Sequence, residues 1–285
     1  MKKMYMALAA ILVASSGFAQ TETIKAGADT TTNRVDTIKV GNFIIIKKRR
    51  EDGSHHSTST VSIDKNPGKP SRISTNWWIF DLGFANVDDR TNYASSEAQN
   101  FLRTVGSGGK PGKDDLKLKA AKSSNVNIWV VMQRVNLVKG YVNLKYGVGL
   151  EMFNFRYENS IRYNKTPNYI YKDSIGFSKD KLYAGYATVP FMLNLNTSPG
   201  RKKGLSISAG ISAGYLVGSH TKEKSEERGK EKTKGDVGLE KFRLAYVGEL
   251  GIGPIRLFGS YSLRKLHENG LEQYPYSVGI RFSNF

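Results

Sequence analysis

The 285-residue sequence contains no cysteine, which excludes disulfide bonds, thiol catalysis and lipid attachment through an N-terminal cysteine. Long apolar runs are also missing. The apolar stretch at residues 4–14 is well short of the roughly 20 residues that a membrane-spanning helix needs. If the chain crosses a bilayer, it must do so as a closed barrel, because open sheet edges leave backbone groups without partners in lipid.

The N-terminus has the layout of a secretory signal. Lys2 and Lys3 precede the apolar stretch, and the segment 15–19, rich in small residues, follows it. We therefore expect residues 1–19 to be a signal peptide that is cleaved before Gln20.

Acidic residues are fewer than basic ones, with 25 Asp and Glu against 43 Lys and Arg, which gives a formal charge of +18. Removing the two lysines leaves 41 basic residues against 25 acidic ones, a charge of +16.

Alternation of apolar and polar residues predicts β-strands over most of the remaining chain. In residues 142–152, for example, the even-numbered positions are apolar or tyrosine and the odd-numbered ones are Asn, Lys, Gly or Glu. Residues 128–132 are an exception, because they are apolar without alternation. Each stretch meets the roughly 9–11 residues of a tilted transmembrane strand. The eight predicted strands are residues 76–87, 125–136, 140–154, 181–195, 204–218, 240–252, 255–265 and 274–285.

The lengths of the connections alternate between short and long. The short ones are residues 138–140, 197–203 and 253–254, and the long ones are about 88–124, 155–180, 219–239 and 266–273. This order is typical of an up-and-down barrel with tight periplasmic turns and extended outer loops. A Greek-key sandwich would not sort its connections in this way. We therefore predict an all-β fold, an eight-stranded antiparallel transmembrane barrel with both chain ends in the periplasm.

Charged residues on the predicted strands fall opposite the apolar stripes. In lipid each Lys or Arg at the midplane would cost about 2–4 kcal/mol, whereas the lumen of an eight-stranded barrel is filled by side chains that can pair. We therefore predict a polar, plugged lumen, which argues against a soluble lipocalin-like binder. The charged residues are Asp81, Lys145, Glu151, Arg243, Glu249, Arg256, Arg264 and Arg281.

Aromatic residues near strand ends predict interfacial girdles, at Trp77, Trp78, Tyr141, Tyr183, Tyr261, Tyr274 and Tyr276.

Residues 20–75 form a polar stretch before the predicted barrel domain of residues 76–285. Within it, residues 37–46 are rich in β-formers and predict a small hairpin about Gly41-Asn42. Residues 47–71 have the composition of a flexible linker. We interpret residues 20–75 as a periplasmic extension and linker that either contacts peptidoglycan or an envelope partner or has no separate role.

Lysines concentrate in the long connections, where they would face the outer leaflet. Phosphate-rich lipopolysaccharide and the other outer-membrane lipids are the natural partners of such charge, and the alternative is a solvated surface without a specific ligand. With a signal peptide and barrel strands, we expect no nucleic-acid partner. The lysines concerned are Lys110, Lys113, Lys117, Lys119 and Lys122 in the first long connection, and Lys222, Lys224, Lys230, Lys232 and Lys234 in the third.

Catalytic motifs are nearly absent, and we predict no catalytic residues, no cofactor and no metal site. One enzymatic alternative stays open, because some small outer-membrane barrels modify lipid A with a His and a Ser at the outer rim. Here Ser219, His220 and His267 follow strands at that end, but no motif identifies a third member of a triad.

The chain resembles the outer-membrane β-barrel proteins abundant in the Bacteroidota, the broad Gram-negative group that includes the PorT-like proteins. The residues that carry the resemblance are 76–84, 181–193 and the closing strand, and it extends over about residues 76–285. It implies the barrel fold and an outer-membrane location but assigns no activity. One departure is that Phe282 and Phe285 fall on opposite faces of a regular strand, so a bulge precedes Phe285 or the last residues leave the sheet.

These observations favour a non-enzymatic outer-membrane protein with a structural, adhesive or interaction role carried by its basic outer loops. Two alternatives remain beside it. One is a narrow solute passage or a secretion-accessory barrel, and the other is the lipid A-modifying enzyme.

Overall fold

The computed structural model describes residues 33–40, 43–50, 58–63, 72–199, 204–252 and 255–283. The chain divides into two compact units, Met1–Pro67 and Gly68–Phe285. The predicted signal peptide, residues 1–19, lies outside the described residues.

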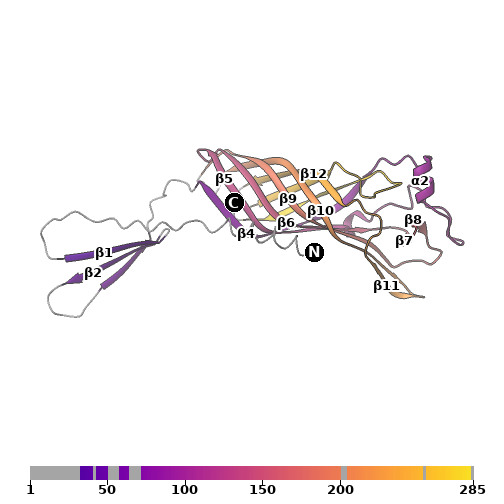
Figure 1. The fold of residues 1–285 in the computed structure, drawn as a ribbon, viewed down its shortest axis with the longest axis horizontal. Coiled ribbons are helices and arrows are strands. Elements are labelled where there is room, and N and C mark those ends of the chain that lie inside the picture. The colour runs from indigo at the N-terminus through magenta and orange to yellow at the C-terminus, as the bar shows by residue number, and fades with distance from the viewer. Residues whose placement is uncertain are drawn as a thin grey trace. The chain divides into compact units, whose positions relative to one another are not determined.

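The first unit contains a three-stranded antiparallel sheet (Figure 1). Strand β1 (Asn33–Val40) pairs with β2 (Phe43–Arg50), with Val40 opposite Phe43, so the predicted hairpin is confirmed. A third strand, β3 (Thr58–Ile63), pairs with the other edge of β2. Our prediction of a flexible linker over residues 47–71 is therefore wrong at residues 47–50, where β2 continues, and at β3. Its β-branched residues suit a strand, and a hairpin alone has a free edge that a third strand can cover.

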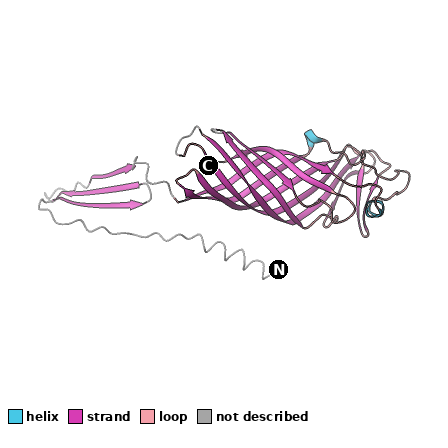
Figure 2. Cartoon of the chain, turned by 90° about the horizontal axis from the view of Figure 1, so that it is seen from above, coloured by secondary structure: helices cyan, strands magenta, loops and turns pink. Residues whose placement is uncertain are grey.

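The second unit is a ring of eight antiparallel strands, seen from two directions in Figures 1 and 2. Each strand pairs with the next along the chain, and the last pairs with the first, so the ring has no free edge within the described residues. The strands are β4 (Ile73–Asp89), β5 (Ser124–Val138), β6 (Val142–Arg156), β9 (Lys179–Asn196), β10 (Leu205–Ser225), β12 (Phe242–Ile252), β13 (Ile255–Ser262) and β14 (Gln273–Phe282).

The eight predicted strands are confirmed, with one large difference at the loop end. Strand β10 continues to Ser225, beyond the predicted end at residue 218, and then pairs with β11 (Gly229–Lys234). The predicted loop over residues 219–239 is therefore mostly a β-hairpin. The sequence pattern did not show this because both faces of the hairpin are polar, so period-2 alternation of apolar residues is absent there.

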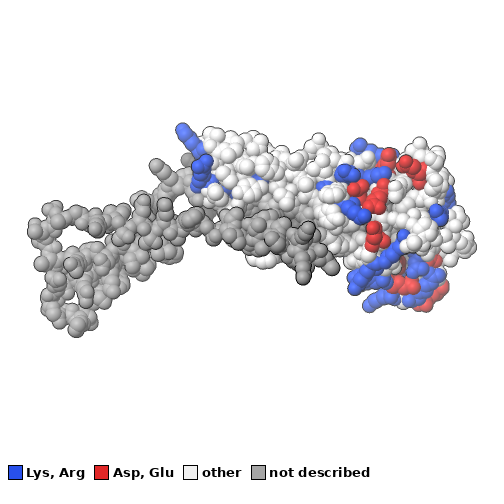
Figure 3. All heavy atoms as spheres, in the orientation of Figure 1, with Lys and Arg blue, Asp and Glu red and all other residues white. Residues whose placement is uncertain are grey.

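The outward face of the ring is apolar along its middle and the inward face is polar. Phe84, Val217 and Tyr246 are about 60% exposed, whereas Asp81 and Asn127, on the other face, are buried. Figure 3 shows an uncharged surface along the barrel, with charged side chains gathered mainly at the loop end. This is the inverse of a soluble barrel, and it fits strands that have lipid on one side.

A β-bulge explains the stretch of β5 that lacks alternation. Between β5 and β6 the register shifts from Trp129 opposite Gly149 to Val131 opposite Val148, which makes Val130 an extra residue. Trp129 and Met132 are consequently both buried inside the barrel while Val130 is exposed. A bulge inserts one residue and changes the phase of everything after it, which is why five apolar residues can run together.

The tight turn between β5 and β6 is a two-residue hairpin. Tyr141 N–H donates to Val138 O at 2.8 Å, and the two intervening residues, Lys139 (φ 45°) and Gly140 (φ 82°), both have positive φ. This is the type I′ geometry that matches the twist of the strands, and it normally favours Asn-Gly.

The long connections fold together at one end of the barrel. They include α2 (Ser96–Phe101), the 3₁₀ turn η1 (Ala120–Lys122) and the hairpin β7 (Ile161–Lys165) with β8 (Asn168–Lys172). Within the described residues no helix has the length and apolar character that crossing a membrane requires. We call the apolar cluster that these connections build together with the adjoining ends of the barrel strands the cap core. Its buried members are Ala85, Phe101, Leu102, Leu116, Phe153, Phe155, Tyr157, Ile161, Tyr163, Ile170, Leu182, Ala184, Tyr186, Val237, Leu239, Leu266 and Leu271.

Candidate functional site

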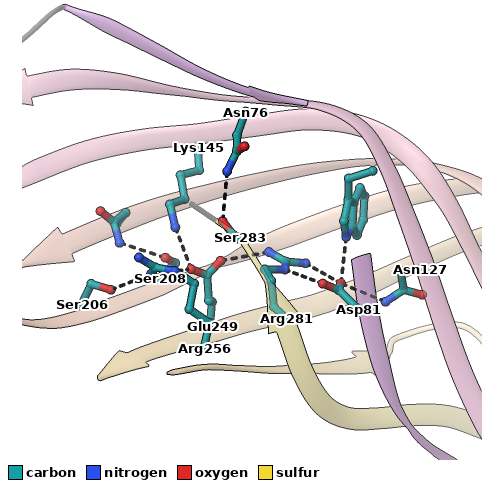
Figure 4. A network of polar contacts seen from close by, with 12 residues as sticks. Asn76, Asp81, Asn127, Lys145, Ser206, Ser208, Glu249, Arg256, Arg281 and Ser283 are labelled. Carbon is teal, nitrogen blue, oxygen red and sulfur yellow. Dashed lines mark hydrogen bonds and ion pairs between the residues drawn. The ribbon is translucent and has the colours of Figure 1, made fainter. Parts of the chain in front are cut away.

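The centre of the lumen is occupied by a cluster of buried charges from four strands (Figure 4). Arg281 of β14 binds Asp81 of β4 through two hydrogen bonds of 2.8 and 2.7 Å. Its remaining amino group, Nη1, donates to Glu249 of β12 at 2.9 Å, and Lys145 of β6 donates to the other oxygen of Glu249 at 2.8 Å. Because all four side chains are inward-facing strand residues, the barrel wall itself holds them in place.

Neutral donors and rings complete this lumen cluster. Asp81 Oδ2 also accepts hydrogen bonds from Trp129 Nε1 at 2.7 Å and from Asn127 Nδ2 at 3.2 Å. The guanidinium of Arg281 lies 5.4 Å from the centre of the Trp129 ring and 5.9 Å from that of Phe258. Buried charges of this kind are tolerated only when they are paired and hydrogen-bonded, as they are here.

A second cluster lies beside the cap core. Arg243 of β12 pairs with Glu151 of β6 at 2.7 Å, and Thr188 donates to the same carboxylate oxygen at 3.0 Å. Arg243 also donates to Ser260 at 3.1 Å, and its guanidinium lies 5.0 Å from the centre of the Phe153 ring. The polar lumen thus merges directly into the apolar cap core.

The clusters leave almost no free volume between them. The cavity lined by Asn127, Trp129, Glu151 and Arg281 measures about 10 Å³, roughly the space of one water molecule. The predicted plugged lumen is therefore confirmed in the described part of the barrel.

The predicted lumen positions are right for seven of eight charged residues and wrong for one. Arg264 lies beyond the end of β13, its side chain is 53% exposed, and it pairs with Glu240 at 3.3 Å. Strand β13 ends at Ser262, two residues before Arg264, so the alternation that we extended to residue 265 stops earlier.

The structure does not bring the three rim residues of the enzymatic alternative together. Ser219 and His220 are consecutive residues of β10, so their side chains point to opposite faces of the sheet. Ser219 Oγ donates to Gly235 O at 2.8 Å. His220 stacks on Tyr183, with the ring centres 4.6 Å apart. His267 is buried in the cap, 3.0 Å from the Tyr163 hydroxyl. No serine–histidine hydrogen bond joins these groups. Among the described residues, no group of His, Asp or Glu side chains is arranged to hold a metal ion.

The buried histidine of the cap is held neutral by its surroundings. Burial among apolar side chains lowers the pKa of His267 to about 3, with a small opposing effect from Asp89. Its ring stacks on Tyr163, whose hydroxyl also contacts the Tyr157 hydroxyl at 2.5 Å. His267 thus behaves as a packed polar residue of the cap.

Residues 91–267, more than half of the chain, match the family described as outer membrane protein beta-barrel domain. The chain belongs to this family. No curated protein matches the chain. Among solved structures, it is similar to Ail, the attachment invasion locus protein of Yersinia pestis, at 15% identity and a TM-score of 0.26, over 73% of this chain and 98% of that chain. A likeness at that TM-score carries no inference about function.

For an outer-membrane barrel, the aromatic residues mark the two edges of the lipid-facing band. Trp77, Trp78 and Tyr141 are exposed at the turn end, and Tyr276 is exposed toward the loop end. Trp78 has a φ of 56°, which interrupts the alternation of β4 and leaves both tryptophans outward. Such girdles are typical of both interfaces of membrane barrels, and these four of the seven predicted aromatic residues fit them. The other three, Tyr183, Tyr261 and Tyr274, are only partly exposed.

The basic residues predicted for the outer loops divide into two groups. Those of the first connection are scattered: Lys117 pairs with Asp114 at 2.7 Å, and Lys110 donates to the carbonyl oxygen of Gln99 at 3.0 Å. Those of the third connection lie on the strands of the β10–β11 hairpin, where their spacing is regular. A sequence reading that treated them as loop residues missed this regularity.

Proposed function

We propose that this protein is a closed, non-enzymatic outer-membrane barrel that acts as a surface interaction protein through its folded cap. The observation that carries the proposal is the filled lumen, where Arg281, Asp81, Glu249 and Lys145 occupy the cross-section with paired charges. A barrel closed in this way has its accessible chemistry at its ends and on its outer wall.

The orientation of the barrel supports an exposed cap. In outer-membrane barrels the short turns face the periplasm and the long loops face outward. The Lys139-Gly140 turn lies at one end, and the cap core at the other. On this orientation the chain enters β4 from the periplasm, so the three-stranded sheet of the first unit is a periplasmic extension that can contact an envelope partner.

The cap is suited to present a stable surface because its loops share one buried core. Phe101, Ile170 and Leu239 come from three different connections and are all buried in it. The charge of the chain, +18 before any cleavage, favours anionic partners at this surface. A PorT-like accessory role in secretion is a narrower version of the same proposal, in which the partner is another envelope protein.

Planar-bilayer recording tests the closed barrel against the solute-passage alternative. We expect the folded protein to insert without conductance steps in bilayers where an open porin, added as the positive control, conducts. Regular steps from the folded protein would refute the closed barrel and support a narrow passage.

Adsorption tests the interaction role. Cells that display the protein should bind beads coated with dextran sulfate, and neutral dextran beads should not bind. Equal adsorption by cells with and without the protein would contradict an interaction role for an anionic partner, whatever the bilayer recordings show.

A further inference from the structure

Three tripeptides of the pattern lysine, acid, lysine lie side by side on neighbouring strands at the loop end. They are residues 179–181 of β9, 222–224 of β10 and 230–232 of β11. Since successive strand residues point to opposite faces, each tripeptide places its two lysines on one face and its acid on the other.

The antiparallel register aligns the three tripeptides residue by residue. In the first row, Lys222 of β10 lies between Lys181 of β9 and Lys232 of β11. The adjacent row is formed in the same way by Lys179, Lys224 and Lys230. The first row continues onto β6, where Arg156 lies opposite Lys181. We call this surface the outward basic face: Arg156, Lys179, Lys181, Lys222, Lys224, Lys230 and Lys232, bordered by Lys234 and His220.

The acids of the three tripeptides form their own row on the inward face. Asp180, Glu223 and Glu231 are opposite one another in the same register. Asp180 accepts the backbone N–H of Ile161 at 2.6 Å, and Glu231 pairs with Arg162. Asp180 and Glu231 are thus engaged on the far side of the sheet, away from the lysines.

The outward basic face has no internal compensation within the described residues. No ion pair joins its lysines or Arg156 to a described carboxylate, and Lys181 instead donates to Asn154 at 2.8 Å. Arg156 Nε is buried with no hydrogen-bond partner in the described structure. Like charges placed directly opposite each other destabilise a sheet, so this arrangement favours the binding of anions.

The position of the face indicates which anions those are. Along the outward side of β9, Lys179 and Lys181 are followed by Tyr183 and then by Val189 and Phe191, both about half exposed. The basic face is therefore the direct continuation of the lipid-facing wall, just beyond the aromatic level. A bound molecule there would have its acyl chains against the wall and its anionic groups beside the lysines.

We propose that the outward basic face binds the phosphate groups of the phosphorylated glycolipid of the outer leaflet, lipopolysaccharide. Several lysines and Arg156 donate to the phosphate oxygens, and the apolar wall below them contacts the acyl chains. A soluble polyanion would gain only the first of these contacts, which is why we favour the lipid. This proposal rests on the outer-membrane location and is independent of the interaction role proposed for the cap.

The experiment replaces the central row. The variant Lys181→Gln/Lys222→Gln/Lys232→Gln and the wild type are reconstituted in phospholipid nanodiscs, and bisphosphorylated lipid A is titrated and followed by native mass spectrometry. We expect the variant to bind lipid A about tenfold more weakly or worse, since charge-assisted hydrogen bonds are lost. We expect wild-type binding to fall similarly when the lipid A is dephosphorylated.

A second readout distinguishes binding from a structural role. Without lipid A, the triple variant should lose its folded, fast-migrating gel band at a higher temperature than the wild type, because like-charge repulsion has been removed. With lipid A the order should reverse, because only the wild type gains stability from the bound lipid. A lower melting temperature of the variant under both conditions would indicate a structural role and overturn the proposal.

Matched controls complete the test. Lys110→Gln/Lys113→Gln/Lys122→Gln removes the same charge from the first connection and should bind lipid A like the wild type, whereas Arg substitutions at positions 181, 222 and 232 should retain binding. Equal loss in the first-connection variant would show that only net charge matters. Unchanged binding of dephosphorylated lipid A, or competition by soluble polyphosphate at similar strength, would each contradict a phosphorylated-lipid site.

Discussion

Arg281 lies directly opposite Asp81 in the register that joins the last strand of the barrel to the first. The two hydrogen bonds between them, 2.8 and 2.7 Å, therefore span the seam where the chain closes on itself, 200 residues apart in sequence. The same guanidinium reaches Glu249 on a third strand. One side chain thus links barrel closure to the filling of the lumen.

Replacing Arg281 by methionine should strongly destabilise the barrel. The change leaves Asp81 and a carboxylate oxygen of Glu249 without their cationic partner in a buried site, and breaking a buried pair from one side costs about 3–5 kcal/mol. The measurement is urea unfolding in lipid vesicles, followed by the shift between the folded and boiled gel bands. Arg264→Met is the matched control, because its exposed pair with Glu240 should contribute at most about 1 kcal/mol. Similar losses in the two variants would contradict the seam role.

Substitutions in the turn between β5 and β6 should change the stability of the barrel in either direction. Lys139 has a φ of 45°, a conformation that asparagine tolerates better, so Lys139→Asn should stabilise the folded barrel slightly. Gly140→Val should destabilise it by about 1 kcal/mol or more, because φ is 82° and an added Cβ would lie 3.0 Å from Pro199 Cβ. The temperature at which the folded gel band disappears measures the stability of both variants. A Gly140→Val barrel as stable as the wild type would refute the turn assignment.

The barrel strands could be predicted because lipid on one side and a polar lumen on the other impose a strict period of 2. The same rule placed Asp81, Lys145 and Arg281 inside. It could not say which of them pair, because a contact such as Lys145 to Glu249 depends on how strands distant in sequence are staggered around the ring.

The cap and the hairpin could not be predicted for a different reason. Ile170, Leu239 and Leu266 are single apolar residues in polar connections, and only tertiary packing shows that they share a core. On the β10–β11 hairpin, both faces are polar, so alternation appears only as a pattern of charge sign. The lysine–acid–lysine spacing was present in the sequence and would have indicated strands there.

Expression of this protein should leave the lipid A of its host unchanged. Ser219 and His220 point to opposite faces of β10, and His267 is buried in the cap, so these residues do not form a nucleophile–base pair. Mass spectrometry of lipid A from cells with and without the protein measures this. An altered spectrum that is lost in His220→Ala or His267→Ala would contradict the non-enzymatic assignment.

The contribution of His267 to the stability of the cap should be lost as the pH falls below about 6.5, while Asp180 and Glu223, whose pKa values are raised by burial, act in the opposite direction. Burial lowers the pKa of His267 to about 3 in the folded cap, from an ordinary value of 6.5 in an exposed chain. Between these values the opened cap binds a proton that the folded cap does not, so stability is fully present above pH 6.5 and is lost as the pH falls toward 3. At pH 5 the loss is about 2 kcal/mol.

Amide hydrogen exchange of the cap at pH 7 and pH 5, corrected for the intrinsic pH dependence of exchange, measures this effect. Between pH 7 and pH 5 the opening of the wild-type cap should increase relative to the opening of the His267→Gln cap, because the variant has no titrating ring at this position. His55→Gln/His56→Gln is the control, since both histidines belong to the first unit of the chain and not to the barrel and its cap, and it should retain the wild-type response. If His267→Gln kept the full pH dependence, another group would have to be the source, and burial of the His267 ring would not control the opening of the cap.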